Sequence, residues 1–150
     1  MAGKSINKNL LEYNSIIKEN EEIYHKIAKK FGLSDCAFWI LYTICEEKGT
    51  LTQTGICDAL YQPKQTVNSA LKKLENDGYI ELETIAGSRS KQINLTEKGS
   101  KFVDNTVGKV IANEQKALLS LTSEEQEVFI GLFHKYTNLL KNNISMMEDW

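Results

Sequence analysis

The segment from residue 52 to residue 99 constrains the fold of this chain more than any other. Its signals predict, in order, a short helix, a tight turn, a second helix and a two-stranded hairpin. Thr52 can cap the short helix, because its hydroxyl oxygen can accept hydrogen bonds from the free N–H groups of the first turn. The only proline of the chain, Pro63, stands where the second helix should begin, and the N–H missing there would have no partner within that helix. The segment therefore predicts a helix-turn-helix with a wing.

The second helix has an apolar and a polar face. Its apolar side chains follow the i, i+3, i+4, i+7 spacing of a buried stripe. They are Val67, Ala70, Leu71 and Leu74. The opposite face carries amide, hydroxyl and amine groups, which are the types that contact base edges and phosphates in a major groove. We expect DNA contacts from Lys64, Gln65, Thr66, Asn68, Ser69 and Lys72.

The hairpin is indicated by alternating apolar residues in Ile80–Leu82 and again in Ile93–Leu95. We expect a short strand at Leu51 to join it. The tip carries two further candidate DNA-binding residues, Arg89 and Lys91, and Arg89 is the only arginine of the chain. A planar guanidinium suits the narrow, negative minor groove of A·T-rich DNA better than a strongly hydrated ammonium group.

These signals resemble the MarR family of winged-helix transcriptional regulators. The resemblance extends over roughly the whole chain, and the residues that carry it are Thr52-Gln53, Lys64-Gln-Thr-Val-Asn68, Lys73-Leu-Glu-Asn-Asp-Gly-Tyr-Ile80, Arg89 and Leu95-Thr-Glu-Lys-Gly99. One position departs from the family pattern. The wing of the family usually carries an aspartate two residues before the arginine, and Gly87 stands there in this chain.

Helical patterns flank the predicted winged helix on both sides. Apolar spacing predicts one long helix over about 7–31 and another that begins after the capping residue Ser34. Thr96 should cap a long helix whose apolar stripe is continuous from residue 102 to residue 118. The sequence Thr122-Ser-Glu-Glu125 is a capping box and predicts the start of the last helix. The fold class is therefore mainly α with a small β-hairpin wing.

The terminal helices carry more apolar surface than one small winged helix can cover. A second copy of the chain is the simplest partner for this surface, and the family resemblance implies the same two-fold homodimer. We interpret residues 1–150 as one unit, with the winged helix at about 33–98 and dimerisation helices at about 6–31 and 99–150. The alternative is a monomer whose terminal helices pack only on the winged helix.

The distribution of charge is compatible with DNA binding, although the total is not basic. The formal net charge is −2, but the stretch from Lys64 to Lys101 carries seven basic and five acidic residues and is therefore at +2. A mildly positive element on an acidic body suits a specific DNA binder with modest non-specific affinity. No apolar run approaches the roughly 20 residues of a membrane span, and no signal peptide is apparent, so a cytoplasmic protein is expected.

The sequence has no phosphate loop, dinucleotide-binding glycine pattern or nucleophile elbow, so we expect no enzyme and no cofactor. The two histidines, His25 and His134, lack metal-ligand spacing. Three cysteines without a CxxC pair do not indicate a disulfide framework, and we expect Cys45 and Cys57 to be small buried side chains. Cys36 lies near a helix N-terminus, which can depress a thiol pKa, so a redox sensor of the same fold stays an alternative.

Taken together, the signals favour a homodimeric transcriptional regulator, a repressor that binds a pseudo-palindromic DNA site. The resemblance implies that a small aromatic or other ligand modulates affinity from a pocket between the dimerisation helices and the winged helix. Four residues are candidates for lining it, and they are equally compatible with a role as core aromatics or surface residues: Tyr24, His25, Trp39 and Tyr42. The rival from another class is a winged helix that binds only proteins.

Overall fold

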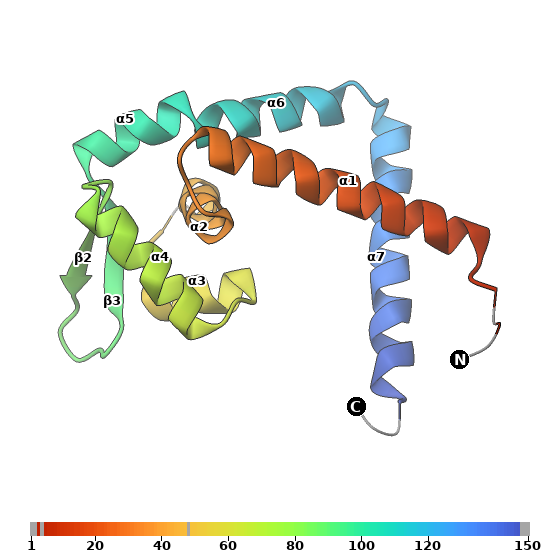
Figure 1. Ribbon diagram of the computed structural model, residues 1–150, viewed down its shortest axis with the longest axis horizontal. Coiled ribbons are helices and arrows are strands. Elements are labelled where there is room, and N and C mark those ends of the chain that lie inside the picture. Colours follow the sequence, from red (N-terminus) through yellow and green to blue (C-terminus); the bar gives the residue numbers. More distant parts are fainter. Residues whose placement is uncertain (1–2, 4, 48, 148–150) are drawn as a thin grey trace. The chain divides into compact units, whose positions relative to one another are not determined.

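The structure is a computed structural model that describes residues 3, 5–47 and 49–147 (Figure 1). Its contacts divide the chain into two compact units, Met1–Gly108 and Lys109–Trp150. The elements in chain order are α1 (Lys8–Lys30), α2 (Asp35–Glu46), β1 (Leu51–Thr52), α3 (Gln53–Leu60), α4 (Lys64–Asn76), β2 (Ile80–Thr84), β3 (Lys91–Leu95), α5 (Glu97–Asn105), α6 (Val107–Leu119) and α7 (Ser123–Ser145). Among the described residues, no helix is both long enough and apolar enough to cross a membrane.

A three-stranded antiparallel sheet forms the wing, with the strand order β1-β3-β2. Ile93 of the central strand pairs with Leu51 on one side and with Leu82 on the other. Leu51, Ile93 and Ile80 are buried, so one face of the sheet belongs to the core of the first unit. The predicted short strand at Leu51 is confirmed.

Helix α4 packs its predicted apolar stripe against α2, α3 and β2 (Figure 1). Val67 and Leu71 are completely buried, and Ala70 and Leu74 are nearly so. The complementary side of the core comes from α2, whose Phe38, Ile40 and Leu41 are also fully buried. Burying a side chain of this size contributes on the order of 2 kcal/mol, so the orientation of α4 about its own axis is strongly determined.

The turn between α3 and α4 is short and has an unusual conformation. Tyr61 ends α3 with φ 52° and ψ 33°, and it is the only non-glycine residue with positive φ in the described part of the chain. Pro63 is the N-cap of α4, as the sequence predicts. At the other end of α4, Gly78 takes φ 83° and allows the chain to turn into β2.

Helix α5 is held against the start of the wing by hydrogen bonds around Thr96. The hydroxyl of Thr96 donates to the carbonyl oxygen of Gly78 at 2.6 Å and accepts from the N–H of Gly99 at 2.9 Å. The Thr96 N–H donates to the carbonyl oxygen of Tyr79, and the ring of Tyr79 stacks on Phe102 with centroids 4.2 Å apart. The backbones come so close that a Cβ on Gly99 would overlap the Tyr79 carbonyl.

The prediction of one continuous helix after the wing is wrong. The helix breaks at Thr106, which has φ −127° and ψ −91° and separates α5 from α6. The Thr106 hydroxyl donates to the carbonyl oxygen of Phe102 at 2.6 Å and competes with the backbone for it. Asn105 and Gly108, on either side, also have low helix propensity, so the apolar stripe continues while the backbone does not.

Helices α7 and α1 leave much apolar surface exposed. The described residues of α7 include no buried side chain, although the predicted capping box of Thr122 and Glu125 is present and starts the helix. In α1 only Ala28 is buried. The large exposed apolar residues of α7 are Val128, Phe129, Ile130, Leu132, Phe133, Tyr136, Leu139 and Leu140. A surface of this kind on a monomer indicates a binding site.

We expect Gly99→Ala to destabilise the unit that contains the wing. The added methyl group would overlap the carbonyl oxygen of Tyr79, which is held by its hydrogen bond from Thr96. The free energy of unfolding should fall by about 2–3 kcal/mol, measured by urea unfolding with circular dichroism. Ser100→Ala, at an exposed position of the same helix, is the control and should change it by less than about 0.5 kcal/mol. Equal effects of both substitutions would contradict this close approach.

Candidate nucleic-acid interface

The exposed face of α4 is the first part of the candidate interface. All six residues predicted there are exposed, on the side of the helix opposite the buried stripe. Within the described part of the chain, Lys64 and Lys72 form no ion pair, whereas Lys73 pairs with Asp77 at 3.1 Å. The face therefore offers uncompensated cations and amide groups to solvent, as contact with phosphates and base edges requires.

The wing and the helix-turn-helix enclose a surface hollow of about 580 Å³, here called the wing–helix hollow. It brings together three of the predicted DNA-binding residues, Lys64, Asn68 and Arg89. Its full lining is Gln53, Thr54, Cys57, Asp58, Gln62, Lys64, Asn68, Arg89 and Ser90. Two cations and one carboxylate face this space, and the remaining groups are mostly neutral hydrogen-bonding side chains. Such a lining suits a nucleic-acid strand, because its cations can attract phosphates and its neutral side chains can form hydrogen bonds.

Sequence reasoning missed the residues that the first helix and the turn contribute to this hollow. Gln53 and Thr54 belong to the first turn of α3, and Gln62 lies in the turn before α4. A polar residue at the start of a helix is also typical of capping, so the sequence held no signal that separated the two roles. Only the fold shows that α3 begins beside the tip of the wing.

The tip of the wing is built from one turn and a set of serine hydrogen bonds. The N–H of Ser88 donates to the carbonyl oxygen of Ile85 at 3.1 Å, and Gly87 within this turn takes φ 76°. This left-handed conformation favours glycine, which accounts physically for the residue at position 87. The Ser90 N–H donates to the Ser88 hydroxyl at 3.1 Å, and the exposed Arg89 lies between these two serines.

The flank of α4 away from the wing–helix hollow borders a larger cleft of about 970 Å³, which extends toward the start of α2. Three predicted DNA-binding residues of α4, Gln65, Thr66 and Ser69, line it. Two others, Lys72 and Lys91, are exposed but line neither the cleft nor the wing–helix hollow. The predicted set is thus distributed along both flanks of α4 and on the wing.

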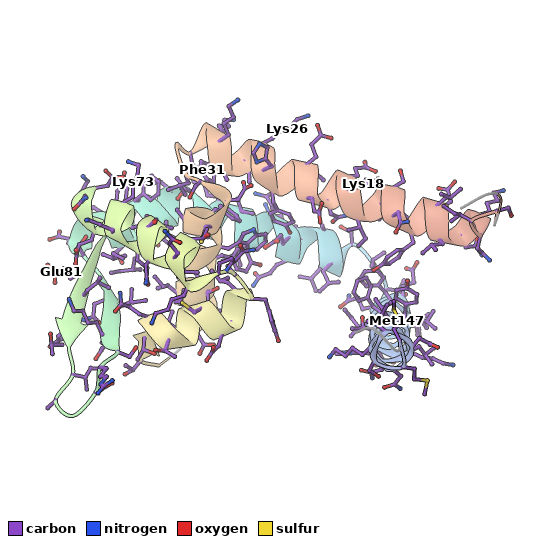
Figure 2. The ribbon with its side chains drawn as sticks, turned by 60° about the horizontal axis from the view of Figure 1, so that its bottom comes forward. Lys18, Lys26, Phe31, Lys73, Glu81 and Met147 are labelled. Atoms are coloured by element: carbon purple, nitrogen blue, oxygen red, sulfur yellow. The ribbon has the colours of Figure 1, made fainter. Side chains whose placement is uncertain are left out.

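The wing also carries acidic groups, and their placement limits how DNA could approach. Glu81 lies on the outer side of the hairpin, away from α3 (Figure 2). Glu83 accepts a hydrogen bond from the Asn94 side chain at 3.0 Å, and Asn94 in turn accepts one from Gln92. Glu81 and Glu83 belong to strand β2, whereas the positive charge of Arg89 lies at the tip of the wing.

Three of the four predicted ligand-pocket residues lie together. Tyr24, His25 and Trp39 line a hollow of about 660 Å³ between α1 and α2. The predicted fourth residue, Tyr42, packs on Trp39 with ring centroids 5.1 Å apart and does not line that hollow. The Nδ1–H of His25 donates to the carboxylate of Asp35 at 2.9 Å and ties α1 to the start of α2.

The cysteines differ from the sequence prediction. Cys45 is exposed and Cys57 is half-buried, so neither is the fully buried side chain that was expected. Cys36 is half-buried, and burial, with a smaller contribution from Cys57, raises the pKa of its thiol. The direction is opposite to the depression of a thiol pKa that a helix N-terminus can produce. Among the described residues, no group of three or more side chains could hold a metal ion.

Comparison with known proteins shows that the chain is similar to helix-turn-helix transcriptional regulators. A sequence description of the MarR family matches residues 31–89. The HTH-type transcriptional regulator PecS of Dickeya dadantii is 30% identical over 122 residues, which cover 79% of this chain and 73% of PecS. YwoH of Bacillus subtilis, an uncharacterised HTH-type transcriptional regulator, is 27% identical over 79% of this chain and 82% of its own length.

Solved structures give the same picture. The chain resembles MepR of S. aureus in its complex with DNA, with a TM-score of 0.69 and 25% identity over 91% of this chain and 99% of MepR. It also resembles NMB1585, a MarR family regulator from Neisseria meningitidis, with a TM-score of 0.76 and 22% identity over 93% of this chain and 98% of that protein. The second likeness supports the winged-helix fold alone.

The raised pKa of Cys36 has a testable consequence. At neutral pH a raised pKa means less thiolate, which is the reactive form, so alkylation by iodoacetamide should be severalfold slower in folded protein than in urea. The rate in folded protein should keep rising as the pH passes above the ordinary range of a thiol. Mass spectrometry of the Cys36 peptide measures both rates. Faster alkylation of Cys36 in the folded state would contradict the raised pKa of its thiol and would favour the redox-sensor hypothesis.

Proposed function

Because this chain belongs to the MarR family of transcriptional regulators, we propose that it binds double-stranded DNA as a homodimer and represses transcription where it occupies a promoter. The observation that carries the proposal is the exposed polar face of α4, which borders the same hollow as an arginine-tipped wing. The sequence likeness to the regulator PecS and the structural likeness to MepR bound to DNA support it.

The wing–helix hollow suggests how one DNA strand would be held. Helix α4 would enter the major groove, and Arg89 would reach the neighbouring minor groove. The sugar–phosphate strand between the two grooves would then lie across the hollow, near Lys64 and Asn68. Asp58 on the same lining would disfavour a phosphate close to it and would help to select the register of the strand.

The homodimer follows from the exposed apolar surface of α7 and α1. The rings of Phe129 and Phe133 lie next to each other on α7 with centroids 6.1 Å apart, and both are exposed in the single chain. A second copy would cover these residues by the two-fold arrangement that most homo-oligomers adopt. A two-fold protein presents two α4 helices in opposite senses, so the site should be a pseudo-palindrome.

Ligand modulation is the finer part of the proposal. The hollow lined by Tyr24, His25 and Trp39 could bind a small aromatic molecule by stacking, with Tyr42 supporting Trp39 from behind. A ligand that prefers one separation of the two α4 helices would change the affinity for a site whose half-site spacing is fixed.

Selection of bound duplexes from a random pool is the experiment that tests this function. The proposal expects enrichment of a two-fold symmetric sequence whose half-sites lie about one helical turn of DNA, or a multiple of it, apart. Failure to enrich any sequence, combined with binding that does not depend on salt, would favour a winged helix that binds only proteins.

Substitutions on the two flanks of α4 should separate base reading from phosphate binding. Gln65→Ala and Asn68→Ala should each cost about 1–3 kcal/mol on the selected site and relax its sequence preference. Lys72→Ala should weaken all sequences alike and lower the salt slope by about one. Fluorescence anisotropy on selected and scrambled duplexes measures these effects. Lys101→Ala, on α5, is the matched control, and variants of α4 that all bind as the control does would contradict the proposal.

Charges placed on the aromatic pair of α7 should disrupt the dimer. The double substitution of Phe129 and Phe133 by Asp would put unpaired carboxylates into an apolar interface and should raise the dimer dissociation constant by more than about 30-fold. The matched control replaces both by Leu, which keeps the surface apolar. Analytical ultracentrifugation measures the dissociation constant. An aspartate variant that remains as dimeric as the leucine variant would show that α7 does not form the interface.

A further inference from the structure

We propose that the hydroxyl groups of Thr54 and Ser90 form a clasp that joins the tip of the wing to the start of α3 and thereby positions Arg89 for DNA. Thr54 and Ser90 are then positioning residues, because they act through Arg89. The inference rests on the proposed DNA-binding function, to which it adds a contact that makes the DNA interface more rigid.

The clasp consists of two hydrogen bonds between segments that are 36 residues apart in the sequence. The backbone N–H of Thr54 donates to the Ser90 hydroxyl oxygen at 3.2 Å, and the Thr54 hydroxyl donates to the same oxygen at 3.0 Å. One serine oxygen therefore accepts both bonds. Both residues line the wing–helix hollow beside Lys64, Asn68 and Arg89.

The backbone bond has a physical reason at the end of α3. The first N–H groups of a helix have no partner within the helix and must be satisfied from outside. Thr52 satisfies the N–H of Gly55 with its hydroxyl at 3.0 Å, in the ordinary local way. Ser90 satisfies the N–H of Thr54, and it does so from the wing. The wing thus supplies a second cap to α3, so its position is tied to a fixed point of the helix-turn-helix.

The clasp also explains how the tip is organised without an acidic side chain at position 87. The turn closed by Ile85 and Ser88 fixes the chain before Arg89, and the bonds of Ser90 fix the chain after it. The backbone of Arg89 is therefore held on both sides. Its guanidinium makes no hydrogen bond or ion pair with any residue that the structure describes, so it remains available to a ligand.

This arrangement should raise DNA affinity without any new contact. A tip that is free in solution must lose conformational freedom when its arginine enters a groove, and this cost weakens binding. When the clasp is already formed in the free protein, the tip loses this freedom during folding. Binding to DNA then no longer includes that cost. Losing two neutral hydrogen bonds of the ordinary kind should weaken DNA binding by roughly threefold to tenfold.

Amide hydrogen exchange, followed by NMR in the free dimer, tests the clasp itself. Ser90→Ala should speed exchange of the Thr54 amide by about threefold or more. The Gly55 amide, which Thr52 caps, should be unchanged and serves as an internal reference. Thr54→Ser keeps both bonds and should behave as wild type. Thr84→Ala is the matched control, because this hydroxyl is on the same hairpin and makes no side-chain hydrogen bond with a described residue. Unchanged Thr54 exchange in Ser90→Ala would overturn the proposal.

A double-mutant cycle on the selected duplex tests the coupling to Arg89. Ser90→Ala alone should weaken binding by roughly threefold to tenfold, but in the Arg89→Ala background it should have almost no further effect. An effect of the same size in both backgrounds would overturn the proposal, since Ser90 would then contact DNA directly or act on α3. Failure of the proposed function would be seen separately, as a lack of sequence-dependent binding by the unmodified protein.

Discussion

Burial of one face of α4 is the constraint on which the rest of the structure depends. Val67 and Leu71 are completely buried against a core that α2 and the wing complete. Rotating the helix by even a third of a turn would expose these side chains and bury its amide and lysine groups, each at a cost of kilocalories per mole. The polar face of α4 therefore has to point to solvent. Packing alone thus produces the surface that is available for a nucleic acid.

The wing depends on the same core at one end and on hydroxyl groups at the other. Its buried strand residues belong to the apolar core. Thr96, which follows the last strand of the wing, is hydrogen-bonded to Gly78 just after α4. At the tip of the wing, Ser90 and Thr54 connect the hairpin to α3. The wing, which forms one side of the wing–helix hollow, is therefore held in place at both of its ends. We expect such a hollow to fit one strand of DNA with little rearrangement.

The sequence predicted the features that are encoded locally. Threonine and serine caps, Pro63 and the apolar stripe of α4 each act through neighbours in the chain, and the structure confirms them. Two of the features that it did not predict depend on tertiary contacts. The bonds from Ser90 to Thr54 join distant segments, and the raised pKa of Cys36 comes from burial that only the fold creates. The break at Thr106 was missed because the apolar stripe continues through it while local backbone competition ends the helix.

An amide chemical-shift map of the protein, titrated with a selected duplex and with a scrambled duplex, tests whether α4, the start of α3 and the wing tip together form the DNA interface. We expect the selected duplex to cause the largest changes along the exposed face of α4, at the start of α3 and at the wing tip around Arg89. The scrambled duplex should cause smaller changes in the same places, through phosphate contacts that do not depend on sequence. Changes confined to other elements, or identical with both duplexes, would contradict a DNA interface at these elements.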